Sequence, residues 1–479
     1  MKFLNHYVVN VVAQGLGRVF TFGSNFIAFV LIARTCGADF FGQYSYILNF
    51  FGIFVIMADF GLIPVLAKDI AQVKDSPQVY WGNFLLIRIW LNVLVVLSSI
   101  ITAYYIRRDL FSLLLIGSLA VPFLASRFFE PIFQVFQHPW RSAYASILYG
   151  VSHLVFLAAA FLFKDKLPFF VLAYIFANVL YTLIALYLSQ KSVKPLFTIN
   201  KSIIKNILKL AMPLGVSSML VVISNRICIL MLAGMKSDYA VGIYSAAYKF
   251  IEISSFVAVI ITAPMLPIFA EKAKDNVESL RYISSDIAEM LAIFILPVGI
   301  ICSSISGKII LFIYGSNLLP AVEVFNILIW VGIIVFYSLL VSNITISIGI
   351  VKYSYWLGAV AAVLSICFNY LLIPKYSYIG SAWTALLCEV VLAGTVIFYA
   401  VRNIGNFFIW KNWMKILSLN LIMFLFLHEK VFNINIFLKI IISLVLYAFF
   451  IVKLNAARKD ALEILSNLKI FSFINANKR

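Results

Sequence analysis

Five cationic side chains lie inside segments of this sequence that are apolar enough to cross a membrane: Arg18, Arg88, Arg127, Arg226 and Lys249. On insertion scales, each such charge costs about 2.5–3.5 kcal/mol at the bilayer centre. Each therefore needs a partner or a role. Arginine and lysine side chains are cationic hydrogen-bond donors without acceptor atoms. Here they can therefore neutralise an acidic group or bind an anion.

Two of the five cations have an acidic residue three positions further along the same predicted helix. Glu130 follows Arg127, and Glu252 follows Lys249. Residues three apart share one face of an α-helix, so an internal ion pair is one interpretation of each. The other interpretation is a functional role, such as a relay for protons or counter-ions.

Arg88 and Arg226 have no acidic residue nearby on their own predicted helix, so any partner for their charge must come from another helix. Arg88 is predicted at a depth similar to that of Asp59, so either an interhelical ion pair or anion binding would explain it. Arg226 follows Asn225 and is predicted at a depth near that of Lys249 on the next helix. Two cations at one depth repel each other unless an anion lies between them.

Arg18 is the least explained charge of the chain. It lies about 15 Å into the first helix at a rise of 1.5 Å per residue, and no acidic residue is within four positions. Its surroundings include Gly17, Gly23 and Ser24, which are small or polar and suit a helix that faces water or packs closely. Arg18 therefore either lines a cavity or binds a carbonyl or acidic group of another helix.

The composition shows which elements must position these charges. Of the 479 residues, 63% are hydrophobic and 12% are charged, whereas soluble domains are about 45–50% apolar and about 25% charged. Fourteen segments approach or exceed the roughly 20 residues that span a bilayer as a helix.

The predicted fold class is an all-α polytopic membrane protein with about 14 transmembrane helices, forming two pseudo-symmetric six-helix lobes plus two C-terminal helices. The predicted segments are 8–33, 40–64, 81–105, 111–137, 142–163, 168–189, 211–234, 240–266, 287–312, 320–350, 352–373, 378–401, 412–428 and 434–454.

The net charge of +18 follows the predicted topology. With the N-terminus in the cytoplasm, cytoplasmic segments carry 22 of the 37 Lys and Arg residues and outer loops carry nine. This asymmetry is the positive-inside rule, so the basic composition does not indicate nucleic-acid binding. The five cysteines show no metal-ligand or disulfide spacing, and neither a cofactor nor a metal site is predicted.

The sequence also contains an internal repeat. Residues 15–64 match 215–264 at twelve of fifty positions without gaps, including Gly-x-Tyr-Ser at 42–45 and 242–245. Six predicted helices precede the second copy, so the repeat is parallel, and transporters built this way place the substrate site between their halves. The predicted parts are a six-helix lobe over 1–195, a cytoplasmic amphipathic linker over 196–210, a second six-helix lobe over 211–401, two additional helices over 402–455 and a cytoplasmic tail over 456–479.

Several short motifs, taken in their order and spacing, resemble those of the bacterial polysaccharide transporter family, which includes the Wzx-type O-antigen flippases. The motifs are Phe41-Gly42-Gln43-Tyr44-Ser45-Tyr46, Asp59-Phe60-Gly61-Leu62, Asn225-Arg226, Val241-Gly242-Ile243-Tyr244-Ser245-Ala246-Ala247-Tyr248-Lys249, and Ile373-Pro374-Lys375-Tyr376.

This resemblance implies the fold of the multidrug/oligosaccharidyl-lipid/polysaccharide exporter superfamily. It further implies a flippase that moves an undecaprenyl-diphosphate-linked oligosaccharide, an O-antigen or capsule repeat unit, across the bacterial inner membrane by alternating access. Membrane lipid and polysaccharide assembly proteins are the other implied partners, and both termini are expected in the cytoplasm. A cavity cation in the first helix of the similar lipid II flippases maps onto Arg18. The seventh-helix site often reads Asp-Arg in relatives and here reads Asn225-Arg226.

The residues and the resemblance lead to one hypothesis of mechanism. Arginine forks bind the diphosphate, the sugar enters a wet cavity and the lipid stays in the bilayer. Arg18 and Arg226 are the foremost substrate-binding candidates, followed by Arg88, Lys249 and Arg127. The candidates for coupling to protons or sodium are Asp59, Glu130 and Glu252.

Two other functions fit a membrane protein of this size. A multidrug or cation exporter of the same superfamily would favour unneutralised acidic groups in its cavity, whereas this chain has unneutralised arginines. A membrane-embedded polysaccharide polymerase or ligase resembles chains with a large outer loop, and every outer loop predicted here is short. The sequence therefore favours a transporter over an enzyme.

Overall fold

The computed structural model describes residues 2–72, 77–136, 138–163, 166–350, 352–428 and 435–454. Within these ranges all regular structure is helical, and ten helical segments are long and apolar enough to cross a membrane. The predicted all-α polytopic fold is thus confirmed. The tail predicted over 456–479 lies outside the described residues.

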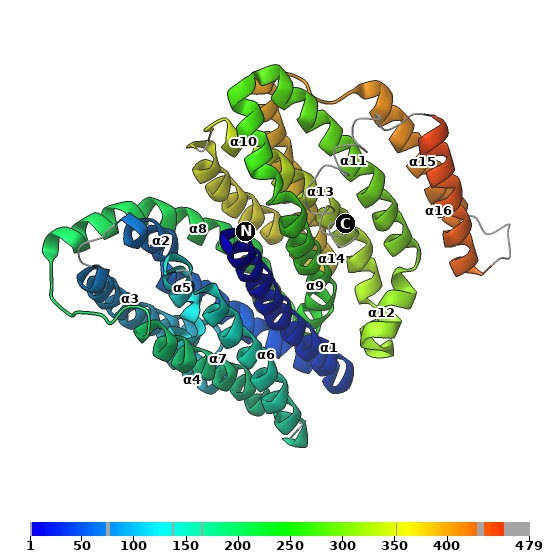
Figure 1. Ribbon diagram of the computed structural model, residues 1–479. Helices are drawn as coiled ribbons and strands as arrows, with labels where there is room; N and C mark the ends of the chain where they lie inside the picture. The colour runs from blue at the N-terminus through cyan, green and yellow to red at the C-terminus, as the bar shows by residue number, and fades with distance from the viewer. Residues whose placement is uncertain are drawn as a thin grey trace. The chain divides into compact units, whose positions relative to one another are not determined.

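The helices, labelled in Figure 1, follow one another along the chain and are joined by short connections. Their bounds are α1 (Lys2–Asp59), α2 (Leu62–Gln72), α3 (Pro77–Ile106), η1 (Arg108–Leu110), α4 (Phe111–Leu124), η2 (Ser126–Phe129), α5 (Glu130–Val135), α6 (Pro139–Ala160), η3 (Phe161–Phe163), α7 (Leu167–Gln190), α8 (Lys201–Met235), α9 (Asp238–Thr262), α10 (Met265–Asp275), α11 (Val277–Ser304), α12 (Ser306–Tyr314), η4 (Ser316–Leu318), α13 (Ala321–Ser347), α14 (Lys352–Ile404), α15 (Trp410–His428) and α16 (Ile436–Lys453).

Two of the helices each contain two of the predicted membrane segments. The predicted break between 33 and 40 is confirmed, because Gly37, where φ is 83°, is not helical and separates two helices that share the label α1. The predicted break between 373 and 378 is a kink at Ser377, where φ is 50°, inside α14. Positive φ leaves the α-helical path without a loop, which glycine tolerates well and other residues adopt at a cost.

The chain divides into two compact units. Unit 1 comprises Met1–Ser245 and Tyr355–Ser381, and unit 2 comprises Ala246–Ser354 and Ala382–Arg479. The boundaries after Ser245 and Ser381 fall inside α9 and α14, so each of these helices contributes to both units. The lobe boundaries inferred from the sequence repeat, at 195 and 211, stay a prediction.

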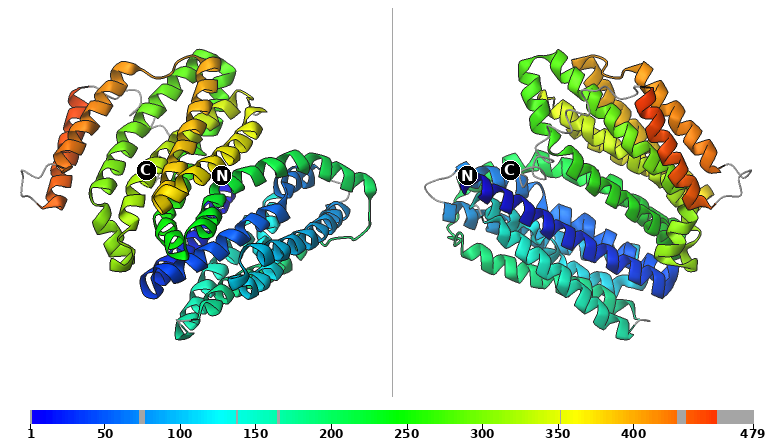
Figure 2. Two further views of the ribbon diagram at one scale, coloured as in Figure 1. Left: turned by 180° about the vertical axis from the view of Figure 1, so that it is seen from behind. Right: turned by 45° about the vertical axis from the view of Figure 1, so that its right-hand side comes forward.

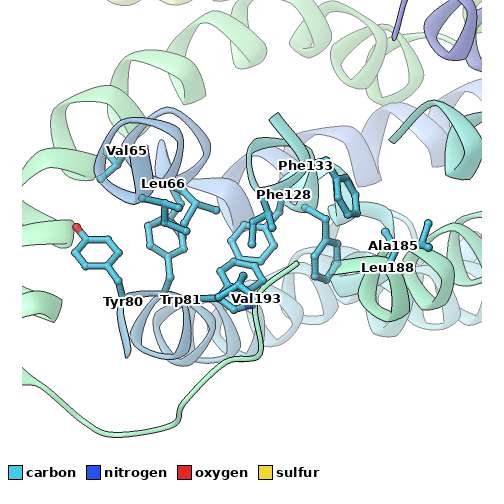
Figure 3. Packing of buried hydrophobic residues seen from close by; sticks show 14 of the residues in the cluster. Val65, Leu66, Tyr80, Trp81, Phe128, Phe133, Ala185, Leu188 and Val193 are labelled. Carbon is cyan, nitrogen blue, oxygen red and sulfur yellow. The ribbon is translucent and has the colours of Figure 1, made fainter. Parts of the chain in front are cut away.

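In unit 1, α1 packs along α6, α6 along α7, and α8 against α1 and α3. One large apolar cluster joins α2, α3, η2, α5 and α7, as Figure 3 shows. At its centre the Trp81 ring stacks on the Phe128 ring with centroids 5.1 Å apart, and both side chains are almost fully buried. This cluster fixes the position of η2, the short helix that carries Arg127.

Glycines allow the closest helix contacts of unit 1. A Cβ atom placed on Gly17 would lie 2.9 Å from the Ala143 Cα atom of α6. One placed on Gly42 would overlap the Asp238 carbonyl, and one on Gly242 would overlap the Ala38 carbonyl. Small residues let membrane helices approach backbone to backbone. The two repeat-related Gly-x-Tyr-Ser motifs therefore begin in a direct contact between α1 and α9.

The predicted linker helix and the predicted seventh span form one helix. The Asn200 side chain accepts hydrogen bonds from the Ser202 and Ile203 amides at 3.0 and 3.2 Å, which caps the N-terminus of α8. Such a cap satisfies amide groups that the helix itself leaves unbonded. From this cap α8 runs to Met235 over 35 residues, through Pro213, so the amphipathic turns continue directly into the apolar ones.

In unit 2, α11 packs against α13 and α15, and α15 packs against α16. The last two helices stay side by side in both views of Figure 2, where α15 is orange and α16 is red. The Tyr447 hydroxyl of α16 accepts a hydrogen bond from the Asn420 amide of α15 and donates one to the Ile293 carbonyl of α11, each at 3.1 Å. The two helices predicted after the repeat are thus present, and α15 is attached to α11.

The glycine contact between α1 and α9 can be tested by adding one methyl group. We expect Gly42→Ala to lower stability by about 1–3 kcal/mol, because the new Cβ collides with backbone that cannot rotate away. Gly23→Ala is the matched control, since nothing lies within 4 Å of a Cβ at Gly23 and alanine favours helix. Thermal unfolding in detergent measures both, and equal melting temperatures would contradict the assigned contact.

Candidate functional site

Arg226 lies on α8 and its guanidinium contacts the second half of α1. Its Nη1 donates a hydrogen bond to the Asn49 Oδ1 at 2.8 Å. A Cβ atom on Gly52 would lie 2.6 Å from the Arg226 Cζ and Nη1 atoms, so the guanidinium rests on the bare backbone of α1. Among the described residues no carboxylate pairs with Arg226. Its charge is therefore hydrogen-bonded but not neutralised.

The charges of Arg226 and Arg127 act on one tyrosine. Tyr174, on α7, interacts electrostatically with both guanidinium groups, and Arg127 also acts on Tyr149 and Tyr181. All of these residues belong to unit 1. Two of the five sequence-predicted cations thus share Tyr174 as a neighbour.

The predicted ion pair of Arg127 with Glu130 is not formed. The described part of the chain has no ion pair at Arg127, and its side chain is exposed. The prediction assumed one continuous α-helix, but α4 ends at Leu124, η2 covers Ser126–Phe129 and α5 begins at Glu130. Because the chain leaves the α-helical path here, three-residue spacing does not bring the two charged groups together.

Arg88 is tightly held inside unit 1. Its side chain is 6% exposed and its Nη1 lies 3.6 Å from the Asp59 Oδ1, which confirms the predicted ion pair. It also donates a hydrogen bond to the Ala125 carbonyl, and its Cζ lies 4.2 Å from the centre of the Phe128 ring. An acid, a carbonyl and an aromatic face together occupy this guanidinium.

Lys249 is neutralised on its own helix. Its Nζ lies 2.6 Å from the Glu252 Oε2, three residues further along α9, so the predicted pair is confirmed. Both residues belong to unit 2. The continuous helix from Asp238 to Thr262 explains why the spacing rule holds here and fails at Arg127.

Arg18 lies exposed on α1, and among the described residues it forms neither a hydrogen bond nor an ion pair. The polar groups near it bond within their own helix: the Thr21 hydroxyl donates to the Gly17 carbonyl and the Ser24 hydroxyl to the Thr21 carbonyl, each at 3.0 Å. These hydroxyls bond to carbonyls of α1 itself, so they do not compensate the charge of Arg18.

Tyr149, His153 and Tyr174 form an aromatic cluster with polar atoms in unit 1. The Tyr149 hydroxyl donates to the Asn25 Oδ1 at 2.9 Å. The His153 ring lies 5.6 Å from the Tyr149 ring and 5.8 Å from the Tyr174 ring, and its two nitrogens have no hydrogen-bond partner in the described residues. Tyrosine combines an apolar ring with a hydroxyl, which suits contact with polar organic molecules. No group of three or more His, Cys, Asp or Glu residues in the described ranges could hold a metal ion.

Arg107, just after α3, bonds to two carboxylates and was not predicted. It donates to the Asp238 Oδ1 and Oδ2 at 2.9 and 3.1 Å, and to the Asp109 Oδ1 and Oδ2 at 2.9 and 2.7 Å. Burial lowers the pKa of Arg107, but the bonds with both carboxylates outweigh burial and raise it. The Tyr46 ring lies 4.9 Å from the Arg107 Cζ. This network fastens the start of α9 to the end of α3.

The other residues missed by sequence reasoning are Asn49, Gly52 and Tyr174. The signal for Asn49 was available, because a lone amide between Ile47 and Phe51 in an apolar helix needs a partner. Gly52 and Tyr174 carry no comparable signal, since glycine and tyrosine are common in membrane helices.

Comparison with known proteins relates the chain to polysaccharide synthesis. A family model described as "Polysaccharide biosynthesis protein" matches residues 8–273. The teichuronic acid biosynthesis protein TuaB of Bacillus subtilis is 26% identical over 293 residues, 58% of this chain, and the match spans only 58% of that protein. An uncharacterized membrane protein of Methanocaldococcus jannaschii is 23% identical over 430 residues, 82% of this chain and 84% of that protein.

Solved structures share the fold at low sequence identity. The lipid II flippase MurJ in an inward closed conformation has a TM-score of 0.74 and 15% identity, covering 92% of this chain and 98% of that one. An inward-facing multidrug resistance MATE family transporter of the MOP superfamily has a TM-score of 0.66 and 14% identity, covering 83% and 98%. The fold that the sequence motifs implied is therefore confirmed.

The Arg107 network can be tested by a double-mutant cycle. We expect Arg107→Gln and Asp238→Asn each to lower stability by about 1–3 kcal/mol, because each leaves a charged partner incompletely bonded. The double variant should lose less than the sum of the two, since it leaves neither charge behind. Thermal unfolding in detergent gives the three values, and strictly additive losses would refute a direct interaction.

Proposed function

The chain belongs to the polysaccharide biosynthesis protein family, and we propose that it is a flippase for a polyprenyl-diphosphate-linked oligosaccharide. In this proposal the protein moves an undecaprenyl-diphosphate-linked repeat unit of an O-antigen, capsule or related glycan across the bacterial inner membrane. It works by alternating access, with both termini in the cytoplasm. The protein is a transporter and not an enzyme, and it hands its cargo to polysaccharide assembly proteins.

The unneutralised guanidinium of Arg226 is the observation that carries this proposal. A guanidinium has five N–H donors, and Asn49 accepts a bond from one of them. The other donors keep the planar fork that matches phosphate oxygens. A membrane-embedded cation without a counter-charge is expensive, and an anionic substrate supplies that charge when it binds.

The neighbours of Arg226 fit the rest of such a substrate. Arg127 adds a second positive charge near Tyr174, which suits a diphosphate better than a single phosphate. The rings and hydroxyls of Tyr149 and Tyr174 can contact sugar. Arg18 is an exposed cation of the same unit and is the third binding residue that we propose.

Two of the sequence candidates fit the substrate site less well. Arg88 is paired with Asp59, and Lys249 with Glu252, so neither offers an unneutralised charge. Coupling to protons or sodium is proposed at Glu130, which no ion pair in the described chain engages.

The same charges weigh against a multidrug exporter for organic cations. Arg226, Arg127 and Arg18 would repel such a substrate, and among the described residues no carboxylate pairs with Arg226. The likeness to a multidrug transporter rests on the fold, and a shared fold does not transfer a substrate.

Transport in liposomes tests the proposal. We expect purified protein to move a fluorescent polyprenyl-diphosphate-linked N-acetylhexosamine between leaflets, and Arg226→Ala and Arg18→Ala each to slow this about tenfold or more, because a charge-assisted hydrogen bond is worth about 1.5–3 kcal/mol. Accessibility of the label to an external quencher gives the rate.

Arg402→Ala is the control, since this exposed arginine at the end of α14 belongs to no proposed site. Protein amount and melting temperature are matched across variants. Full transport by both Arg226→Ala and Arg18→Ala would overturn the assigned binding residues, and failure of the wild type to move this lipid would overturn the substrate class.

A further inference from the structure

The internal repeat places different residues at one equivalent position. At the constant offset of 200 that relates 15–64 to 215–264, Asn49 corresponds to Lys249 and Gly52 to Glu252. Both pairs lie on a continuous helical stretch, one turn apart. Phe50 and Ile53 are identical to Phe250 and Ile253, and Phe51 corresponds to the equally apolar Ile251, so the charge differs only at the polar pair within 49–53.

The net charge at this position differs between the two repeats. In unit 2 the Lys249 Nζ and the Glu252 Oε2 are 2.6 Å apart, and the pair is neutral as a whole. In unit 1 Asn49 and Gly52 are both uncharged, and a cation from another helix, Arg226, lies against them. The first repeat thus holds a positive charge where the second neutralises one.

Asn49 is oriented for this contact. Its Nδ2 donates to the Ser45 carbonyl at 2.8 Å, one turn earlier on α1. An amide that donates through its nitrogen there must turn its oxygen the other way, and that oxygen accepts the bond from Arg226 at 2.8 Å. The Ser45 carbonyl therefore orients the Asn49 side chain so that its oxygen faces the Arg226 guanidinium.

Gly52 provides the space for the guanidinium. A Cβ atom there would lie 2.6 Å from the Arg226 Cζ and Nη1 and 2.9 Å from its Nε. Any side chain at position 52 would push the fork away from α1 and break its alignment with Asn49. A glutamate there, as in the second repeat, would neutralise the charge as well.

We propose that Asn49 and Gly52 are positioning residues that hold Arg226 in place while leaving its charge unneutralised for the diphosphate of the substrate. Asn49 takes one N–H donor and contributes no charge, so the remaining donors face an incoming anion at full strength. This inference rests on the proposed function, because it assumes that Arg226 binds the diphosphate.

A purely structural contact between α1 and α8 makes a different prediction. If the contact only joined helices, a stronger bond at position 49 would be harmless to binding. If it keeps the charge available, a stronger bond that also neutralises the charge must weaken binding. Asn49→Asp separates these cases, because aspartate has nearly the same shape and stays ionised beside a guanidinium.

The experiment measures binding of undecaprenyl diphosphate to the full-length protein in detergent by ligand-induced thermal stabilisation, with undecaprenol as the uncharged comparison. We expect Asn49→Asp to weaken undecaprenyl diphosphate binding about tenfold or more. The melting temperature of the free protein should change little, because the ion pair with Arg226 offsets the lost bond to the Ser45 carbonyl. Gly52→Ala should weaken it similarly, whereas Gly23→Ala, where a Cβ meets nothing within 4 Å, should leave it unchanged. Binding of undecaprenol should be the same in all variants.

Arg226→Gln makes the outcomes distinguishable. If Arg226→Gln abolishes diphosphate binding while Asn49→Asp and Gly52→Ala bind like the wild type, the positioning role is wrong and the proposed function stands. If Arg226→Gln binds like the wild type, the anion site itself is wrong and the positioning role fails with it. A loss of undecaprenol binding in Asn49→Asp would also overturn the inference, because it would show a change in packing and not in charge.

Discussion

A positive charge in a membrane-spanning helix must be compensated within the protein or by a ligand, and this constraint organises the polar part of the fold. Compensation is complete at Arg88, which has an acid, a carbonyl and an aromatic ring. It is complete in a simpler way at Lys249, through one carboxylate on its own helix. At Arg226 only an amide oxygen compensates, and at Arg18 no described group does. The degree of compensation thus separates the cations that stabilise the fold from those that can bind an anion.

Close packing by small residues makes this selective compensation possible. Apolar helices in lipid gain no hydrophobic energy from contact with each other, so they associate through close packing and hydrogen bonds. Gly17 brings α1 onto α6, and Gly42 with Gly242 brings α1 onto the start of α9. Arg107 and Asp238 add a charged contact at the same start of α9. The half of α1 that receives Arg226 at Gly52 is therefore held against α9 at Gly42, and the half before Gly37 is held against α6 at Gly17.

The sequence predicts the helices and the ion pairs that lie on continuous helix, because hydrophobic segments and three-residue spacing are local properties. It predicts the Lys249–Glu252 pair for this reason and fails at Arg127, where the chain leaves the α-helical path. It also predicts the break between the first two segments, because Gly37, whose φ is 83°, leaves the helical path there. Contacts between distant helices, such as that of Asn49 with Arg226, depend on packing that no local pattern contains.

The repeat explains how one fold can hold both a neutral and a charged version of the same position. In the first repeat both members of the pair are uncharged, since Asn49 and Gly52 stand where the second repeat has Lys249 and Glu252. The uncharged pair then accommodates an arginine from a different helix, whose charge nothing on α1 cancels. The anion site that we propose at Arg226 is therefore asymmetric between the two repeats, since Arg226 also stands where the first repeat has Phe26.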